Sequence, residues 1–190
     1  DFITTKGDTI NIEGYSIDVI TDLAIDWLDK KRNPEKPFLM MYLHKAPHRA
    51  WWPSPEKFKT FSKRKFPEPE SLFDDYENRG TAAKTAEMNI LKHMMLSYDL
   101  KVHPDAVTEL SIKTDPRDKR LFENGDFSRT NETQRPLYEE IIDSITNHFK
   151  THWPTMTDRE KMKWKYQRYI QDYLACISSV DDNVGRVLNY

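Results

Sequence analysis

The sequence lacks several features that would define a class of protein at once. It has one cysteine, Cys176, which excludes an internal disulfide framework. No apolar run approaches the roughly 20 residues of a membrane-spanning helix. The formal net charge of −2 provides no general basic field for nucleic acid, and residues 1–3 do not resemble the start of a signal peptide. A disulfide scaffold, a membrane span and a general nucleic-acid partner are therefore excluded.

The composition predicts a globular chain with a limited core. Hydrophobic residues make up 37% of the 190 residues and charged residues 32%, and the mean hydropathy is −0.82. The length fits one domain, but these values argue against a large self-sufficient core. Five tryptophans, nine tyrosines and nine phenylalanines argue against disorder, because aromatic side chains bury a large area each. We therefore expect a folded but incomplete domain.

The most informative segment is an apolar run that ends in cationic residues. Residues 38–43 (FLMMYL) predict a buried parallel strand, and Pro47 predicts a bend beyond it. An amphipathic helix predicted over residues 16–31 precedes this strand, which makes an αβ unit. Ligands of open α/β sheets bind beyond the carboxyl ends of the strands, so cationic groups there indicate an anionic substrate. These groups are His44, Lys45, His48 and Arg49.

The strongest helical pattern lies at the C-terminal end. It starts at Thr157, where TDRE has the form of a capping box, and continues for about thirty residues. Its apolar stripe, which includes Val180, Val184 and Leu188, is expected to pack against the sheet. The other predictions are a helical turn at residues 56–61, helices at 73–96 and 137–149, and loop between 99 and 136.

Three blocks of the sequence resemble one enzyme family. Residues 37–51 (PFLMMYLHKAPHRAW) resemble the segment of type I sulfatases that carries a sulfate-contacting histidine, especially in N-acetylglucosamine-6-sulfatases and their gut-bacterial relatives. Residues 14–22 (GYSIDVITD) match the helix that leads into that strand. Residues 164–188 resemble the helix before a late active-site strand. The blocks follow the family's order and span nearly the whole chain.

The resemblance implies an α/β fold of the alkaline-phosphatase-like type, present here as a partial sheet with flanking helices and long loop insertions. It also implies calcium and a formylglycine nucleophile made from cysteine in a Cys-x-Pro-x-Arg motif. Cys176 is followed by Ile-Ser-Ser, and the aspartates that open the calcium site are absent, so no metal ligand is assigned here. Residues 1–190 are therefore expected to be an internal part of a single catalytic domain. The nucleophile-bearing N-terminal part and the C-terminal part would lie outside it. The family further implies a periplasmic or secreted location.

The resemblance makes His48 the predicted catalytic residue. An imidazole can contact sulfate or help protonate the leaving oxygen near neutral pH. From spacing alone, a structural histidine at a strand end is the alternative. Lys45 is predicted to bind the sulfate, with a solvent-facing lysine as its alternative. His44 and Arg49 are predicted to touch the sugar or to orient the loop.

Two other segments are candidates for substrate binding. Arg79 forms a polar cluster with Asp74, and this cluster either lines the substrate pocket or caps the following helix. The basic stretch at residues 57–65 (KFKTFSKRK) is either a solvated face or an electropositive rim for a sulfated polysaccharide. The basic stretch lies within the proline-rich loop of residues 47–69, and the cluster of Asp74 and Arg79 follows that loop.

The sequence therefore predicts part of a sulfuric ester hydrolase that removes sulfate from a sulfated glycan, for example one of the N-acetylglucosamine-6-sulfate type. The nearest alternative is a phosphodiesterase or phosphonate hydrolase of the same superfamily, because sulfate and phosphate are both tetrahedral anions. A noncatalytic helical interaction module is the alternative from a different class. The missing nucleophile favours that module, whereas the cationic strand end does not.

Overall fold

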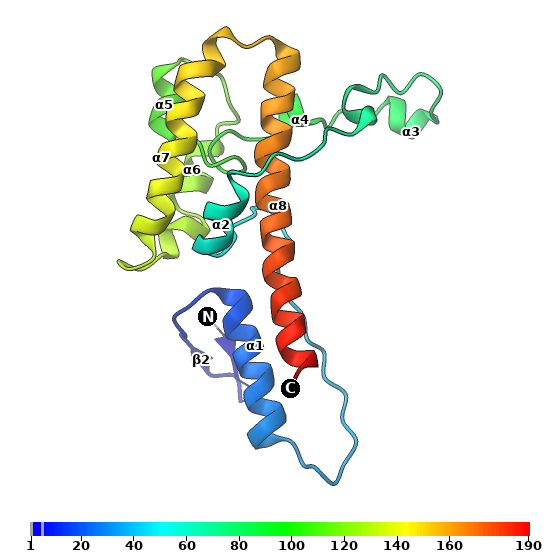
Figure 1. Ribbon diagram of the computed structural model, residues 1–190, viewed down its shortest axis with the longest axis vertical. Coiled ribbons are helices and arrows are strands. Elements are labelled where there is room, and N and C mark those ends of the chain that lie inside the picture. The colour runs from blue at the N-terminus through cyan, green and yellow to red at the C-terminus, as the bar shows by residue number, and fades with distance from the viewer. Residues whose placement is uncertain (1, 5) are drawn as a thin grey trace.

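The computed structural model describes residues 2–4 and 6–190, and helices dominate it (Figure 1). No helix of these residues combines the length and apolarity needed to cross a bilayer. Two short strands pair antiparallel, with Phe2 opposite Ile10. In chain order the elements are β1 (Phe2–Ile3), β2 (Thr9–Ile10), α1 (Ser16–Asp26), η1 (Trp27–Lys31), α2 (Pro55–Phe61), η2 (Glu70–Phe73), α3 (Thr81–Lys84), α4 (Ile90–His93), α5 (Pro104–Glu109), α6 (Asp118–Glu123), η3 (Asp126–Arg129), α7 (Arg135–His152), η4 (Trp153–Thr155) and α8 (Asp158–Leu188).

The main core lies between α2, α5, α6, α7 and the segment that precedes α5. Phe58 of α2, Phe149 of α7 and Leu100 are completely buried. Tyr138 donates its hydroxyl hydrogen to the carbonyl of Pro53 at 2.7 Å, which ties α7 to the loop before α2. Burial of large aromatic side chains is the main stabilising term here. The complete cluster contains Phe58, Leu96, Leu100, Val102, Ala106, Val107, Phe122, Phe127, Tyr138, Ile141, Ile142, Ile145, Phe149 and Trp153.

Helix α8 begins as predicted but buries a different face. Thr157 and Glu160 form the reciprocal capping box, with the Thr157 N–H donating to the Glu160 carboxylate at 2.8 Å. The predicted apolar stripe is wrong for this chain, because Val180 and Val184 are only partly covered and Leu188 is 79% exposed. The buried residues are mostly polar: Lys165, Arg168, Gln171, Asp172, Ala175, Cys176, Ser179 and Asn183.

The polar face of α8 is buried because the chain supplies hydrogen-bond partners for it. Lys165 donates from Nζ to the carbonyls of Leu91 and Met94, at 2.7 Å each. The Gln171 side chain donates to the carbonyl of Arg64 at 2.6 Å. A buried polar group that is satisfied in this way avoids most of the cost of desolvation. The face of α8 that packs against the rest of this chain is therefore its polar, hydrogen-bonded face.

The predicted buried strand at residues 38–43 is extended but forms no strand among the described residues. Leu39 is 90% exposed and Met41 is 75% exposed, so the prediction of burial is wrong for this chain. Alternate residues face the helices instead, and the Tyr42 hydroxyl hydrogen-bonds with the hydroxyl of Thr21 on α1. This period of two is that of a β-strand with one covered face. The expected sheet is not completed by the part of the chain that the structure describes.

The remaining predictions have mixed outcomes. Helices at α1 with η1, at α2 and at α7 confirm those predicted at residues 16–31, 56–61 and 137–149. The long helix predicted at 73–96 is wrong, because that segment forms only the short turns η2, α3 and α4. The part of this segment around α3 projects from the body (Figure 1), and Met88 is 81% exposed. A long helix does not form there, because no tertiary packing offsets the cost of helix nucleation. The loop predicted between 99 and 136 contains α5 and α6.

Candidate functional site

The bend after the extended segment is held by its own hydrogen bonds. The His48 N–H donates to the Lys45 carbonyl at 2.9 Å, and the Trp51 indole N–H donates to the Pro47 carbonyl at 2.9 Å. The Trp51 ring is buried and packs edge-on against Tyr169 of α8, with ring centroids 4.8 Å apart. The bend is therefore anchored to α8 at one end while His48 stays exposed.

One hydrogen bond fixes the orientation of the His48 ring. Its Nδ1 contacts the carbonyl oxygen of Arg49. A carbonyl oxygen can only accept, so Nδ1 carries the hydrogen in this contact. The neutral ring then has its lone pair on Nε2, which is the nitrogen available to a ligand. The backbone of the bend thus selects the tautomer of the candidate catalytic residue.

His48 and Lys45 line one hollow of about 750 Å³. Three stretches that are far apart in the sequence form its walls: residues 11–20, the bend, and the chain from η3 into α7. The last stretch was not predicted from the sequence, because nothing in its composition connects it with the bend. The polar residues that it and the N-terminal wall add to the hollow are Asn11, Glu13, Tyr15, Ser16, Asp126, Arg129, Thr130, Asn131, Gln134 and Tyr138.

The Arg49 side chain binds a buried carboxylate. Its Nε and Nη2 donate to the two carboxylate oxygens of Asp99, at 2.6 Å each. Asp99 is fully buried, and its Oδ2 also accepts from the Met95 N–H at 2.8 Å. The carboxylate raises the pKa of the Arg49 guanidinium above its usual value. Arg49 does not line the hollow, so its side chain orients the loop in this structure.

The structure does not bring His44 or Arg79 to the hollow. His44 lies on the covered side of the extended segment, where burial lowers the pKa of its imidazole. Its two ring nitrogens have no hydrogen-bond partner among the described residues. Arg79 lies before α3, where it pairs with Asp74 at 2.9 Å, and its side chain is 59% exposed. Asp74 does not cap α3, because Gly80 occupies the N-cap position.

A buried polar network lies beneath the bend. Lys101 is fully buried and donates from Nζ to the Asp99 carbonyl at 2.9 Å. The same Nζ lies 3.8 Å from Oδ2 of Asp172 on α8 and 4.7 Å from the centre of the Trp52 ring. Burial lowers the pKa of Lys101 and raises the pKa of Asp172, and their mutual attraction opposes both shifts. The network joins the bend, the segment before α5 and α8.

Neither a nucleophile nor a metal site is formed by the described residues. Cys176 is 2% exposed, and burial raises the pKa of its thiol to about 12. A thiol with that pKa is protonated near neutral pH and is a poor nucleophile. Within the described part of the chain, no group of three or more histidine, cysteine, aspartate or glutamate residues is placed to hold a metal ion. The residues present therefore do not fit a calcium or formylglycine site.

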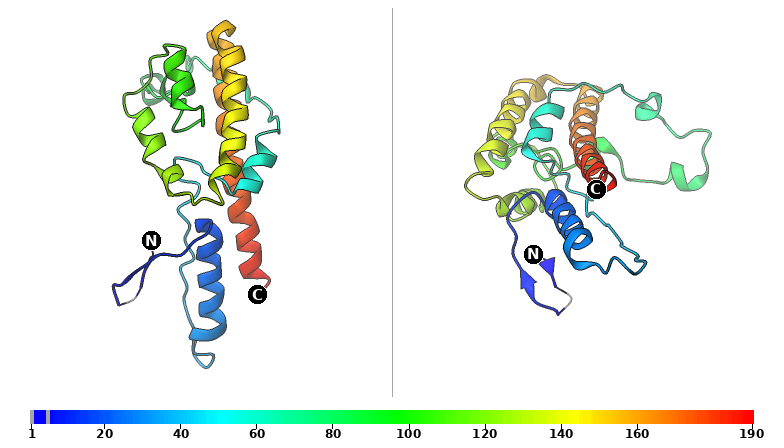
Figure 2. Two further views of the ribbon diagram at one scale, coloured as in Figure 1. Left: turned by 90° about the vertical axis from the view of Figure 1, so that its left-hand side faces the viewer. Right: turned by 60° about the horizontal axis from the view of Figure 1, so that its bottom comes forward.

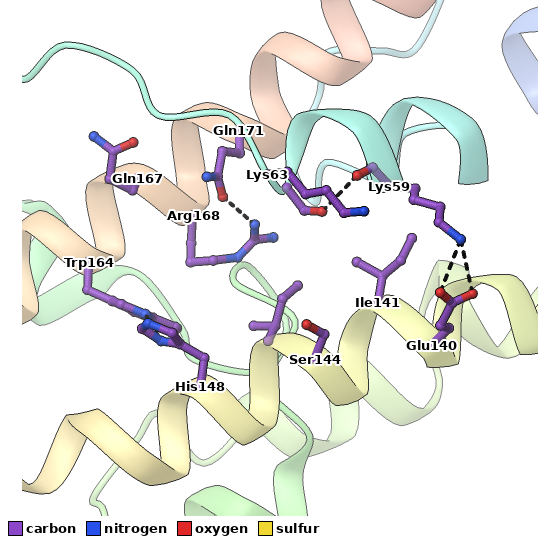
Figure 3. Close-up of a pocket in the computed structure, with 12 residues that line it drawn as sticks. Lys59, Lys63, Glu140, Ile141, Ser144, His148, Trp164, Gln167, Arg168 and Gln171 are labelled. Atoms are coloured by element: carbon purple, nitrogen blue, oxygen red, sulfur yellow. Dashed lines mark hydrogen bonds and ion pairs between the residues drawn. The ribbon is translucent and has the colours of Figure 1, made fainter.

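A separate groove of about 460 Å³ lies between α2, α7 and α8 (Figure 3). It contains part of the basic stretch at residues 57–65, but its polar groups mostly pair with one another. Lys59 contacts Glu140 at 3.1 Å, and the Trp164 indole N–H donates to Nδ1 of His148 at 3.2 Å. Outside this groove, Lys57 pairs with Asp182 at 2.6 Å. These pairs support the solvated-face reading of the basic stretch.

Comparison with known proteins gives consistent results. The family model described as Sulfatase matches residues 2–190. The chain is 39% identical over 179 residues to an N-acetylglucosamine-6-O-sulfatase of Bacteroides thetaiotaomicron, and this match covers 94% of the chain and 30% of that enzyme. A solved structure of BT4656 in complex with its substrate D-glucosamine-2-N,6-O-disulfate has a TM-score of 0.80 and 36% identity. That match covers 97% of this chain and 35% of the solved one. The chain thus spans about a third of the length of these relatives, and the fold it matches is α/β and alkaline-phosphatase-like.

Proposed function

Because the chain belongs to the sulfatase family, we propose that it is an internal part of a sulfuric ester hydrolase that removes sulfate from a sulfated glycan. A glucosamine carrying a 6-O-sulfate is the proposed substrate, since both relatives are described with such a sugar or such an activity. The observation that carries the proposal is the shared hollow of His48 and Lys45 in a chain matched over residues 2–190. The proposal includes a periplasmic or secreted location, as is usual for this family.

His48 has a defined chemical role in this proposal. Its Nδ1 hydrogen is held by the Arg49 carbonyl, so Nε2 is the nitrogen that contacts a sulfate oxygen or the oxygen of the leaving sugar. When the ring is protonated, Nε2 donates to that oxygen and helps the alcohol to leave. A positioned acid of this kind typically contributes 10²- to 10⁴-fold in rate, on the order of 3–5 kcal/mol.

Lys45 adds charge to the same hollow. Its ammonium group is exposed, and it lines the hollow together with His48. A cation beside a sulfate stabilises the bound anion directly. Lys45 therefore binds the sulfate, whereas His48 takes part in bond cleavage. This division predicts a larger kinetic effect for His48.

Calcium and formylglycine, which this family generally uses, would be supplied by residues beyond this chain in the proposed enzyme. Calcium would balance the charge of the sulfate, and the formylglycine would provide the nucleophile. Cys176 does not qualify, because it is buried within α8 and its thiol is protonated near neutral pH. The isolated 190-residue chain is accordingly expected to release no sulfate from an aryl sulfate.

The test is sulfate release by the full-length protein that contains this chain. N-acetylglucosamine-6-sulfate and D-glucosamine-2-N,6-O-disulfate are the substrates, and inorganic sulfate is measured by ion chromatography. His48→Ala should lower kcat/KM by roughly 10²- to 10⁴-fold, and Lys45→Ala should lower it less. His152→Ala, an exposed histidine of α7 outside the hollow, is the matched control and should change little.

Each other outcome leads to a different conclusion. Hydrolysis of bis-nitrophenyl phosphate without sulfate release would favour the phosphodiesterase alternative. No hydrolysis of either substrate would favour a noncatalytic interaction module. Sulfate release that is unchanged in His48→Ala would contradict the role of His48 while leaving the reaction class in place.

A further inference from the structure

The contact between Arg49 and Asp99 attaches the bend to a fully buried carboxylate. Both carboxylate oxygens of Asp99 accept from the guanidinium at 2.6 Å, which is the paired geometry that gives arginine–carboxylate contacts their strength. The Arg49 side chain is 43% exposed, whereas the Asp99 side chain is completely buried. The pair thus joins a surface loop to a fixed anion inside the protein.

Asp99 is itself held from several directions. Its Oδ2 accepts from the Met95 N–H at 2.8 Å, and its carbonyl accepts from Nζ of Lys101 at 2.9 Å. Lys101 is buried between the Trp52 ring and Asp172 of α8. Because α8 and the core fix these groups, the carboxylate has little freedom to move. The anchor is therefore as rigid as the helical body that holds it.

The same arginine also holds His48. The Arg49 side chain binds Asp99, while its backbone carbonyl accepts the hydrogen on Nδ1 of His48. The guanidinium and that carbonyl belong to one residue, so fixing the first restrains the second. Because the carbonyl holds the hydrogen on Nδ1, Nε2 is the nitrogen that gains the second proton and donates it in the proposed reaction. Arg49 connects the buried acid to the catalytic imidazole.

We propose that Arg49 and Asp99 are positioning residues that hold the His48 ring in its Nδ1–H tautomer and in its place at the hollow. The catalytic consequence rests on the proposed sulfatase function, but the tautomer of His48 does not. This assignment differs from a direct contact of Arg49 with the substrate. In that case Asp99 would matter only for stability, and loss of Arg49 would raise KM.

The first arm of the test is kinetic and uses the full-length protein. Arg49→Ala and Asp99→Asn should each lower kcat about 10- to 100-fold and change KM by less than about threefold, because misplacement of a catalytic group acts on the chemical step. The double variant should lose no more than the worse single variant, since both changes break one contact. Arg49→Lys should recover part of kcat through a single contact with Asp99.

A neighbouring ion pair provides the matched control. Arg117 donates to both carboxylate oxygens of Asp115, at 2.9 and 2.7 Å, but neither residue forms a hydrogen bond or ion pair with the bend among the described residues. The positive charge of Arg117 lies close enough to Arg49 to oppose the rise in the Arg49 pKa. Arg117→Ala should therefore leave kcat within about twofold of the wild-type value if position, rather than local charge, is what matters.

The second arm measures the tautomer of the His48 ring and requires no enzymatic turnover. Long-range ¹⁵N–¹H spectra of the full-length protein distinguish the two neutral tautomers, and His48→Ala assigns the signal. The wild-type ring should be in the Nδ1–H form, and Arg49→Ala should shift it toward a mixture. Thermal unfolding of each variant shows whether it is folded. If Asp99→Asn does not fold, the Arg49 variants alone decide the result.

Two results would overturn the proposal. One is a His48 signal that is the same in Arg49→Ala as in the wild type. The other is a double variant whose losses multiply while KM rises, which would make Arg49 a substrate contact. If the wild type releases no sulfate, the proposed function fails, and the spectra still decide whether Arg49 positions His48.

Discussion

The two halves of the molecule differ in how completely the chain covers its own apolar surface. The helical body consists of α2, α5, α6, α7 and the N-terminal half of α8, and it encloses a core around Phe58 and Phe149. The open half consists of α1, the extended segment at residues 37–45 and the C-terminal half of α8 (Figure 2). There Leu39 is 90% exposed and Leu188 is 79% exposed. One half is closed by this chain, and the other presents an uncovered apolar face.

The contacts inside the open half explain this difference. Asn183 of α8 donates to Asp18 of α1 at 2.7 Å, and Arg186 pairs with Asp22. Polar groups thus join α1 to α8, while several apolar residues of α8 and of the extended segment are exposed to solvent. Exposed apolar groups in a row indicate an interaction surface. We propose that polypeptide beyond this chain covers that face, since the chain spans 30% of the sulfatase it resembles in sequence.

The largest expected difference between the halves is in hydrogen exchange. In the isolated 190-residue chain, the amides of α7 should exchange about 10³-fold more slowly than those of residues 37–45, equivalent to about 4 kcal/mol of opening free energy. The reason is that α7 contributes to a closed core, whereas the extended segment forms no strand ladder within the described residues. Mass spectrometry of peptic fragments measures both regions at once. Equal protection would mean that the comparison of halves is mistaken.

A core substitution tests the body directly. Phe149→Ala should lower the free energy of unfolding of the isolated chain by about 3–5 kcal/mol, because the ring is fully buried and its loss leaves a cavity. Leu137→Ala in the same helix is the control, since Leu137 is 49% exposed and should cost far less. Urea denaturation followed by circular dichroism gives both values. A small loss for Phe149→Ala would show that the body does not form alone.

The longer helices of the body were predictable from the sequence because their signals are local, whereas α5 and α6 lie in the segment predicted as loop. The capping box of Thr157 and Glu160 and the apolar spacing in α7 predict helices that the structure contains. The buried face of α8 was not predictable in the same way. Spacing identifies an apolar stripe, but which face is covered depends on the partners present, and this chain presents carbonyls to Lys165. The prediction of a buried strand at residues 38–43 was wrong for the same reason: the segment is extended, but no strand lies beside it among the described residues.

The candidate site was predictable only where its residues are neighbours in sequence. His48 and Lys45 lie within one motif, and both line the hollow. Arg129 and Gln134 reach the same hollow through the packing of α7, which no local pattern reveals. The role of Arg49 also depends on Asp99, fifty positions away, so the sequence left open whether Arg49 touches the sugar or orients the loop. Such long-range contacts require the folded chain.

The junction of the two halves contains Cys176, which gives a pH-dependent test. The thiol ionises near its ordinary pKa of 9.0 when unfolded and near 12 when folded, because it is buried. Between these values the unfolded state binds fewer protons than the folded state, so stability falls as pH rises. Its contribution is fully present below about pH 9. Cys176→Ala should remove this contribution and lessen the loss at pH 10 by about 1 kcal/mol.

The measurement for Cys176 is chemical denaturation of the wild type and of Cys176→Ala at pH 8, 9 and 10. Serine is avoided, because it would place a new hydroxyl in the buried site. If the free energy of unfolding falls equally steeply with pH in the two proteins above pH 9, the thiol is accessible to water and the junction is open. A second check is alkylation at pH 8, which should be slow in the native protein and fast in urea.

The smallest expected effects come from the uncovered face, and they separate the two explanations for it. In the isolated chain, Leu39→Ala and Leu188→Ala should each change the free energy of unfolding by less than about 0.5 kcal/mol, because both side chains are mainly in water. In the full-length protein the same substitutions should cost about 2–5 kcal/mol if other polypeptide covers these leucines. Met88→Ala, exposed on the projecting segment near α3, should change little in either protein if that segment stays uncovered. Costs for Leu39→Ala and Leu188→Ala that stay near zero in the full-length protein would mean that the open face remains in solvent, and the extended segment would then not be a buried strand of the complete enzyme.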